Sequence, residues 1–483
     1  MIHMKLYAEN ILLSDGWAQH VTLTIDNGII SEIVTDSALE NKEGDPCVSS
    51  DNVHVLQNQL DHNTIIAAGA VIPGMVNCHS HAFQRAFAGF SEQGSEGKDS
   101  FWTWRNVMYK FLAQLSNDDA KVIAKQLYIE MLKSGYTRVA EFHYLHHDIS
   151  GATYDKSNQS LATMAKAIFE ASKESGIGLT LLPVLYQYAG FGEQTPNEGQ
   201  KRFINPTLQF NELVTECFEL SKQYNNTNVG IAPHSLRAVD KTSLKAAVSH
   251  VRQLNDKAPI HIHIAEQTQE VNDCLAFYGQ RPVQWLLNNM ELDEQWCLIH
   301  ATHINNEERQ GIIESKAIAG ICPTTEANLG DGIFPTTDFL AESGTFAIGS
   351  DSHISVNPVE ELRWLEYAQR LITQQRAILA SKTTPSVGQN LWCKAALGGA
   401  QSTHSNTGAI AVGKQADLVV LDGNKTRLFA QNTQHLLDSV IFASQTNMVN
   451  DVMVNGDWVV CNKQHLDEDE SEDNFSALLA KLS

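Results

Sequence analysis

Positive charge is scarce in this chain. Its 483 residues contain 34 Lys and Arg against 56 Asp and Glu, and the formal net charge at pH 7 is −22. Such a balance repels phosphate backbones and anionic lipid, so nucleic acid and membrane surfaces are excluded as expected partners. It does not exclude a small anionic substrate, because a few arginines decide the charge of a single pocket.

The chain also lacks a long apolar run, and we expect no secretory leader. No run reaches the ~18 residues that a membrane helix requires. The first residues, MIHMKLYAENILLSDGW, show no basic region followed by an apolar one. The eight cysteines contain no CxxC pair, and scattered cysteines are typical of free, buried thiols in a reducing compartment. We therefore expect a cytoplasmic protein with no membrane partner.

Both ends of the chain are rich in predicted strands. Near the N-terminus, turn residues separate the stretches KLYAENILL, VTLTIDNGIISEIV and HNTIIAAGAVI. Near the C-terminus the pattern returns in ADLVVLD and VNDVMVNGDWVV, with Asn455-Gly456 as a hairpin turn. We predict that residues 1–70 and 405–465 form one small β-sandwich domain. Residues 466–483 are predicted to be an acidic segment followed by a C-terminal helix.

Between these ends, residues 71–404 alternate short apolar strands with longer helical patterns. Helical spacing is clear in residues 118–135, 160–176 and 241–255. The eight strand candidates are AVIPGMVNCH, TRVAEFHYL, IGLTLLPVLY, NVGIAPHS, PIHIHIAE, WCLIHATH, AIAGICPT and TFAIGSDSH. Eight strands alternating with helices predict an α/β fold, namely a (β/α)8 TIM-like barrel flanked by the small β domain.

Histidine and carboxylate residues recur at the ends of these strands, where barrel enzymes place their chemistry. In chain order they are His79, His81, His143, His234, His261, His263, Glu266, His300 and Asp351, with Tyr144 beside His143. Residues two apart on a strand share a face, so His79 and His81 can both point into the barrel mouth. Together with a further strand-end histidine and a strand-end aspartate, they indicate one divalent metal. The ligand types favour zinc.

The fifth strand carries a second HxH pair, His261 and His263, which leaves two candidates for one ligand position. Glu266 follows His263 by three residues, where a strand-end turn brings its carboxylate toward a metal-bound water. His263 is therefore the preferred ligand, and we expect the deeper His261 to pack in the barrel interior with a hydrogen-bond partner. Glu266 is then the candidate general base and acid, and His300 the candidate for polarising the electrophile.

Several of these motifs resemble the amidohydrolase superfamily. They are HSH after a PGMVN strand, HIHIAEQ, the histidine of the sixth strand, GSDSH, and the C-terminal stretch TGAIAVGKQADLVVLD. The HxxE spacing of His263 and Glu266 is similar to the deaminase branch, which uses a single metal. Binuclear members usually place a carboxylated lysine at the end of strand four. This chain has His234 there, so the resemblance implies one metal ion.

Longer motifs resemble the formimidoylglutamate deiminase family within that superfamily. They are HSHAFQRAFAG, DSFWTWRNVMY, AEFHYLHHD, HIHIAEQTQEV, CPTTEANLGDGIFP and GSDSHISVNPVEELRWLEY. Enzymes of this family hydrolyse N-formimino-L-glutamate to N-formyl-L-glutamate and ammonia, in a bacterial route of histidine degradation. The resemblance covers nearly the whole chain, and it implies a small anionic substrate and one zinc ion. It also leads us to expect a homodimer, which is common among relatives.

The same resemblance implies a role for each matching position. The implied metal ligands are His79, His81, His263 and Asp351. The implied catalytic residues are Glu266, His300 and Asp351, and the implied substrate-binding residues are Gln84, Arg105, Tyr144, His234 and Arg237. Arginine suits this substrate, because the substrate carries two carboxylates and a planar guanidinium binds a carboxylate through two hydrogen bonds.

Two other interpretations stay open. A related mononuclear deaminase would act on a nucleobase or another amidine, although arginines at 105 and 237 favour an anionic, flexible substrate over a neutral purine. A metal-free scaffold that kept the barrel would have lost ligands, whereas every expected ligand is present. No role follows from the sequence for Arg85, His143, His146, His147, His303 and His353.

Overall fold

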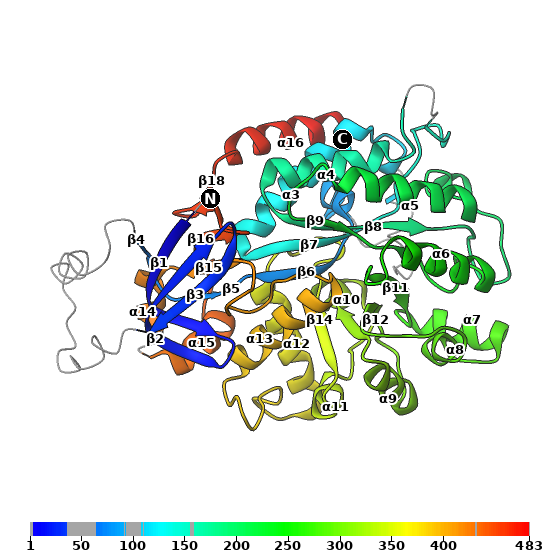
Figure 1. Cartoon of the computed structure of the whole chain (residues 1–483). Coiled ribbons are helices and arrows are strands. Elements are labelled where there is room, and N and C mark those ends of the chain that lie inside the picture. Colours follow the sequence, from blue (N-terminus) through cyan, green and yellow to red (C-terminus); the bar gives the residue numbers. More distant parts are fainter. Residues whose placement is uncertain are drawn as a thin grey trace, which may run out of the picture.

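A computed structural model describes residues 3–35, 64–90, 92, 108–109, 111–154, 159–429 and 432–482 of the chain. Figure 1 shows two parts that lie side by side. One is a barrel of strands surrounded by helices. The other is a separate sheet, built from strands of both ends of the chain.

Eight strand positions form the barrel, and the fourth of them consists of two short strands. The strands are β6 (Met75–Ser80), β7 (Tyr136–His143), β8 (Gly178–Leu185), β9 (Thr227–Val229), β10 (Ala232–Pro233), β11 (Ile260–Ile264), β12 (Trp296–His300), β13 (Ile318–Ile321) and β14 (Thr345–Ile348). They are paired in the order β10-β8-β7-β6-β14-β13-β12-β11. Parallel bridges from Ile231 to Ile260 and from Ser235 to His263 close the ring. The predicted (β/α)8 barrel is confirmed.

Helices cover the outside of the barrel and connect its strands (Figure 1). They are α3 (Asn117–Ser134), α4 (Thr163–Ser175), α5 (Thr207–Ser221), α6 (Lys241–Leu254), α7 (Thr268–Tyr278), α8 (Pro282–Asn289), α9 (Asn306–Ser315), α10 (Pro323–Leu329), α11 (Thr336–Ala341), α12 (Pro358–Thr373) and α13 (Val387–Ser402). At the start of α3, Ser116 and Asp119 each accept a hydrogen bond from the other's backbone amide, and the helix ends at Gly135 in the left-handed conformation. These local signals explain why the prediction for this helix misses each end by a single residue.

The barrel strands are predictable because both of their faces are covered. Every residue of β7 and of β8 is buried, since one face lies in the barrel interior and the other under the helices. Such strands read as continuous apolar runs in the sequence. The fourth strand is interrupted at Gly230, where an added Cβ would lie 2.2 Å from the carbonyl oxygen of Pro259. The close approach of two backbones therefore requires glycine at this position.

The second sheet combines strands from both ends of the chain. Its strands are β1 (His3–Leu13), β2 (Gly16–Asp26), β3 (Ile29–Thr35), β4 (Thr64–Ile66), β5 (Val71–Pro73), β15 (Leu418–Leu421), β16 (Val449–Val454), β17 (Asp457–Cys461) and β18 (Gln464–His465). The pairing order is β18-β17-β16-β15-β5-β1-β2-β3, and β4 pairs with β1. Because β5 is parallel to β1 and antiparallel to β15, it joins the two ends.

The stretch from residue 70 to residue 79, predicted as one strand, forms two. Its first part, β5, belongs to the small sheet, and its second part, β6, belongs to the barrel. Gly74 separates them. Its amide donates to the carbonyl oxygen of Asp417 at 2.9 Å, and an added Cβ would lie 2.3 Å from the Thr137 side chain. The chain therefore passes from one sheet to the other at a position where only glycine fits.

The remaining helices are η2 (Ala82–Phe87), η3 (Glu198–Gln200), η4 (Thr433–His435), α14 (Gly423–Phe429), α15 (Leu436–Phe442) and the longer C-terminal α16 (Glu468–Leu482). The acidic run was predicted to precede the last helix, but it forms the first turns of that helix. Carboxylates are favourable there, because they interact with the positive end of the helix dipole. Glu468 pairs with Lys133 of α3. Leu478 and Leu482 are buried in a core that also contains Ile123 of α3, and Figure 1 shows α16 beside α3.

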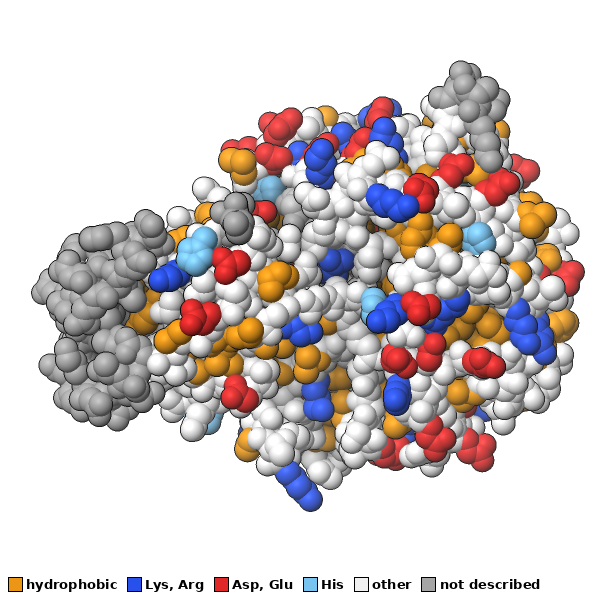
Figure 2. Space-filling model, viewed as in Figure 1, with side chains coloured by type: hydrophobic (Ala, Val, Ile, Leu, Met, Phe, Trp, Pro, Cys, Tyr) orange, Lys and Arg blue, Asp and Glu red, His pale blue; other side chains and the backbone are white. Residues whose placement is uncertain are grey.

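The surface agrees with the sequence composition. On the face drawn in Figure 2, acidic and basic side chains are interspersed rather than separated. Among the described helices, none is both long and apolar enough to cross a membrane.

Candidate active site

A pocket lies at the C-terminal ends of the barrel strands, with an empty volume of about 570 Å³. Nine of the predicted site residues line it, namely His81, Gln84, Tyr144, His234, Arg237, His263, Glu266, His300 and Asp351. His79 is fully buried, with its ring in contact with those of His81 and His263. The remaining predicted site residue, Arg105, lies outside the described residues. Residues that are far apart in the sequence are thus brought together as the strand-end pattern predicts.

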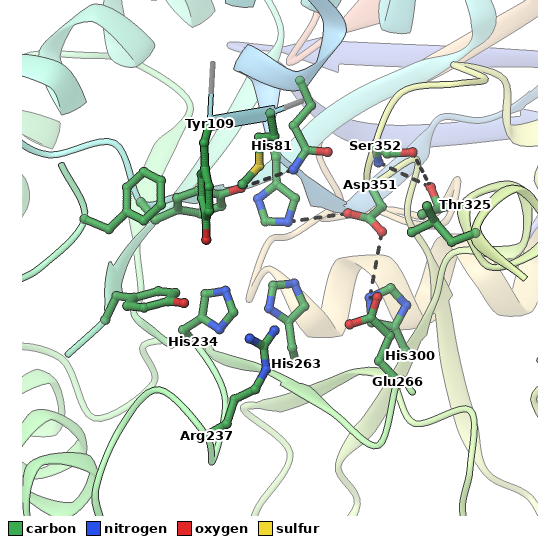
Figure 3. Close-up of a pocket in the computed structure, with 16 residues that line it drawn as sticks. His81, Tyr109, His234, Arg237, His263, Glu266, His300, Thr325, Asp351 and Ser352 are labelled. Carbon is green, nitrogen blue, oxygen red and sulfur yellow. Dashed lines mark hydrogen bonds and ion pairs between the residues drawn. The ribbon is translucent and has the colours of Figure 1, made fainter. Parts of the chain in front are cut away.

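The four predicted metal ligands converge from three strands. His79 and His81 lie at the end of β6, His263 lies on β11, and Asp351 follows β14. The Nε2 atoms of His79 and His263 are 3.0 Å apart. Asp351 Oδ1 is 3.4 Å from Nε2 of His79 and 3.4 Å from Nε2 of His81. Figure 3 shows His81, His263 and Asp351 directed toward one region of the pocket.

These spacings fit a single zinc ion. A tetrahedral zinc with bonds of about 2.0–2.1 Å to nitrogen and oxygen holds its ligand atoms about 3.3 Å apart, which is close to the three distances given above. The Nε2 atoms of His79 and His263 are close enough for a hydrogen bond between the rings or for a shared cation. The Nδ1 atom of His79 is also buried and has no hydrogen-bond partner among the described residues. Three imidazoles and one carboxylate are a donor set that zinc prefers.

The protonation states of the three histidines suit the same ion. Burial lowers the pKa of His79 to about 3, and it lowers the pKa values of His81 and His263 as well. Neutral imidazoles offer a lone pair to a metal. His81 Nδ1 bonds the carbonyl oxygen of Phe142 at 2.9 Å, which leaves Nε2 as the ligand nitrogen.

Asp351 is fixed by the backbone as well as by its side chain. Its amide donates to the carbonyl oxygen of His79 at 3.0 Å, and its own carbonyl oxygen accepts from the His81 amide at 3.4 Å. Its φ of 46° lies in the left-handed region, an uncommon conformation that functional sites often contain. Burial alone would raise the pKa of this carboxyl, but the hydrogen bond with His79 and the nearby histidines hold it below its usual range. Asp351 is therefore an anion.

Glu266 and His300 form a second functional pair beside the ligands. His300 Nε2 is 3.8 Å from Glu266 Oε1 and 3.8 Å from Asp351 Oδ2. Burial raises the pKa of Glu266 to about 7 against the opposing charge of His300. Burial would lower the pKa of His300, but the charge of Glu266 and a hydrogen bond to Glu326 outweigh it and raise the value to about 10. A carboxyl with a pKa near 7 can both accept and return a proton.

Polar groups on the remaining walls could orient a substrate. Gln84 Nε2 donates to the Tyr144 hydroxyl at 3.2 Å, and that hydroxyl contacts Met108 Sδ at 3.3 Å. His234 Nδ1 is 3.0 Å from Ser235 Oγ. Figure 3 shows Arg237 reaching into the pocket next to His234 and His263. A cation, an imidazole, an amide and a phenol thus share one pocket with the metal-ligand group.

Known proteins resemble this chain over nearly its whole length. The model of the amidohydrolase family matches residues 70–459. The chain belongs to the amidohydrolase family. The formimidoylglutamate deiminase of Pseudomonas aeruginosa is 45% identical to it over 478 residues, which is 99% of each chain. The predictions of an amidohydrolase resemblance and of a hydrolase are confirmed.

Two solved structures share the fold. An amidohydrolase from Brucella melitensis has a TM-score of 0.88 at 41% identity, and the match covers 99% of each chain. An adenosine deaminase from Xanthomonas campestris, solved with bound zinc, has a TM-score of 0.77 at 19% identity. That match covers 99% of this chain and 98% of the other. At this low identity the second likeness shows the fold alone.

His353 and Arg85, for which the sequence predicted no role, form hydrogen bonds around the end of β6. His353 Nε2 lies 3.2 Å from the Ser80 hydroxyl and 3.2 Å from the His81 amide. Arg85 donates to the carbonyl oxygen of His353 at 3.0 Å and pairs with Glu130 at 2.8 Å. Arg85 therefore points away from the substrate walls and acts on the backbone. The other histidines in that group, His143, His146, His147 and His303, are not among the described residues that line the pocket.

Glu326 contacts a functional residue but was missed by sequence reasoning. Its Oε1 lies 3.3 Å from His300 Nδ1 and accepts from the Cys322 amide at 2.9 Å. The contact orients the His300 ring so that Nε2 faces Glu266. The only available signal was the position of Glu326 in the CPTTEANLGDGIFP motif. A glutamate in the first turn of a short helix is more simply explained as a favourable helix start.

Proposed function

We propose that this amidohydrolase hydrolyses N-formimino-L-glutamate to N-formyl-L-glutamate and ammonia, with one zinc ion held by His79, His81, His263 and Asp351. The observation that carries the proposal is that one pocket is lined by Glu266, His300, Arg237 and three of the four proposed ligands, with His79 buried in contact with two of those ligands. The 45% identity to a formimidoylglutamate deiminase across the whole chain supports this substrate. We also keep a homodimer, a cytoplasmic location and a place in histidine degradation as predictions.

The chemistry requires a nucleophile and a proton carrier. Bound zinc would supply a nucleophilic water near neutral pH by lowering the pKa of that water. Glu266 accepts the proton of the attacking water and returns it to the departing nitrogen, for which a pKa of about 7 is suited. His300, as a cation, stabilises negative charge that develops on the oxygen or nitrogen bonded to the formimino carbon. Asp351 accepts a proton as the tetrahedral carbon collapses and ammonia leaves.

Polar groups beside the ligands would bind the glutamate part of the substrate. Arg237 and Arg105 are proposed to bind its carboxylates, each with a two-pronged hydrogen bond. Gln84, Tyr144 and His234 are proposed to complete this set of polar groups. Binding energy from these groups would place the formimino carbon beside Glu266, which lowers the entropic cost of the reaction.

A second candidate is a deaminase of the same branch that acts on a nucleobase or another amidine. The aromatic residues Tyr109, Tyr186 and Phe203 line the pocket as well, and such rings can stack on a base. Arg237 argues against it, because a neutral purine ring offers no carboxylate to the guanidinium.

Ammonia release by the zinc-loaded protein separates the two candidates. The assay compares N-formimino-L-glutamate with guanine, cytosine and adenosine at equal concentration. We expect rapid release of ammonia from N-formimino-L-glutamate and background release from guanine, cytosine and adenosine. Faster release from any base would replace the proposed substrate.

A further inference from the structure

Glu270 is a buried carboxylate that lies behind the turn carrying Glu266. It belongs to the first turn of α7, and only 6% of its surface is exposed. Its Oε1 accepts a hydrogen bond from the Ala265 amide at 3.2 Å, and its Oε2 accepts one from the Glu266 amide at 3.0 Å. Both oxygens of one side chain are therefore used on two consecutive amides immediately after β11.

The turn decides which way Glu266 points. Side chains alternate along a strand, so an extended continuation of β11 would place Glu266 on the face opposite His263 and away from the pocket. Ala265 instead has a φ of 52°. This left-handed residue reverses the alternation, and Glu266 lines the pocket together with His263.

That conformation requires support. A residue with a Cβ in the left-handed region costs roughly 1–2 kcal/mol, and two buried amides without acceptors would cost more. Glu270 offsets both costs, since its two oxygens accept both amides in the left-handed arrangement.

We propose that Glu270 is a positioning residue, which holds the Ala265–Glu266 turn and thereby aims the Glu266 carboxylate at the attacking water and the departing nitrogen. The inference rests on the proposed function for its kinetic test. Glu270 does not line the pocket in the described part of the chain, so it acts through Glu266 and not on the substrate.

The test replaces Glu270 by Gln in the full-length, zinc-loaded enzyme. The Gln amide keeps one acceptor but turns an NH2 group toward a backbone N–H, so the turn loses a hydrogen bond. We expect kcat to fall about 100-fold, the order expected for a displacement of about 1 Å at a reacting group. KM and zinc content should change by less than about threefold, since the metal ligands and substrate walls are untouched.

Glu366 provides a matched control. It is fully buried on α12, and its Oε1 and Oε2 accept from the consecutive amides of Ile378 and Leu379 at 3.1 and 3.0 Å. None of these three residues lines the described pocket. Glu366→Gln should lower the free energy of unfolding while kcat stays within about twofold of the wild type.

Amide hydrogen exchange at Ala265 and Glu266 gives a second readout that needs no substrate. Glu270→Gln should speed exchange at these two amides, whereas Glu366→Gln should leave them protected. If Glu270→Gln does not fold, Glu270→Asp serves instead, because it keeps the charge but is too short to reach both amides. A folded variant with wild-type kcat, a loss confined to KM, or unchanged exchange at both amides would overturn the inference. If the wild type fails to deiminate N-formimino-L-glutamate, the proposed function falls, and amide exchange still tests Glu270.

Discussion

The two HxH pairs of this barrel have the same spacing but different surroundings. His79 and His81 both belong to the metal-ligand group, at the C-terminal end of β6. In the second pair only His263 belongs to that group. His261, two residues earlier on β11, is fully buried, and its Nε2 lies 2.7 Å from the carbonyl oxygen of Ser402 at the end of α13.

Depth along the strand explains the difference. Both residues of an HxH pair point to the same face, but they lie about 6–7 Å apart along the strand. In β6 both imidazoles still reach the cluster of candidate ligands, although His79 is fully buried. In β11 this distance places His261 one layer deeper, where burial lowers its pKa to about 4 and a backbone carbonyl is its partner. The prediction that His261 packs in the interior is confirmed, and spacing alone does not identify a ligand.

Removing a ligand at the mouth should have the largest effect. His263→Ala deletes one of four ligand atoms, so we expect zinc content to fall well below that of the wild type and ammonia release to reach background. Metal analysis after dialysis, with a parallel assay of ammonia, measures both. His261→Ala is the matched control from the same strand. Full zinc content and activity in His263→Ala would contradict the assigned ligand set.

Glu266→Gln should have the second largest effect on activity, because it removes the proton carrier but no metal ligand. We expect zinc content to be unchanged and kcat to fall about 10²- to 10⁴-fold, the usual contribution of general acid–base catalysis. Steady-state kinetics of the variant, with its metal content measured in the same preparation, provide the check. Near-normal turnover in the metal-loaded variant would remove Glu266 from the mechanism.

Arg237→Ala should affect binding more than chemistry. Loss of a charge-assisted hydrogen bond of about 1.5–3 kcal/mol corresponds to a rise of about 10- to 100-fold in KM, with a smaller change in kcat. Arg252→Ala is the control. Arg252 lies on the outer helix α6, pairs with Asp293 at 2.9 Å and does not line the described pocket. An unchanged KM in Arg237→Ala would count against a carboxylate-binding role.

His261→Ala should have the smallest effect on function and a measurable one on stability. The change leaves the Ser402 carbonyl oxygen without its partner and opens a cavity, so we expect the free energy of unfolding to fall by about 1–3 kcal/mol. Urea denaturation measures this loss, and metal analysis should give the same zinc content as the wild type. Loss of zinc in His261→Ala would show that His261 is itself a metal ligand.

The sequence was sufficient where local pattern determines structure. Barrel strands such as β7 and β8 read as apolar runs, and the capping residues of α3 are visible in the sequence. The shared sheet of the two chain ends was also expected from their strand patterns. The position of β5 between β1 and β15 was not, because no local signal assigns residues 71–73 to that sheet rather than to the barrel. For the same reason the stretch around Gly74 was expected to be a single strand.

In the candidate site, too, the residues with a local sequence signal were predicted and those placed by tertiary contacts were not. His79, His81, His263 and Asp351 could be named because strand ends meet at one end of a barrel and because their motifs resemble a known family. Glu270 and Glu326 could not, since a glutamate in the first turn of a helix has an ordinary explanation as a stabilising helix start. Their contacts with Glu266 and His300 depend on tertiary distances that no spacing encodes.

The products formed in oxygen-18-labelled water test the central claim most directly. The zinc-loaded wild type should convert N-formimino-L-glutamate to ammonia and N-formyl-L-glutamate, with the label in the formyl oxygen, because water attacks the formimino carbon and the terminal nitrogen leaves. Mass spectrometry of the products reads out both the bond that breaks and the origin of the oxygen. Formation of glutamate and formamide, or of N-formyl-L-glutamate without the label, would contradict the account.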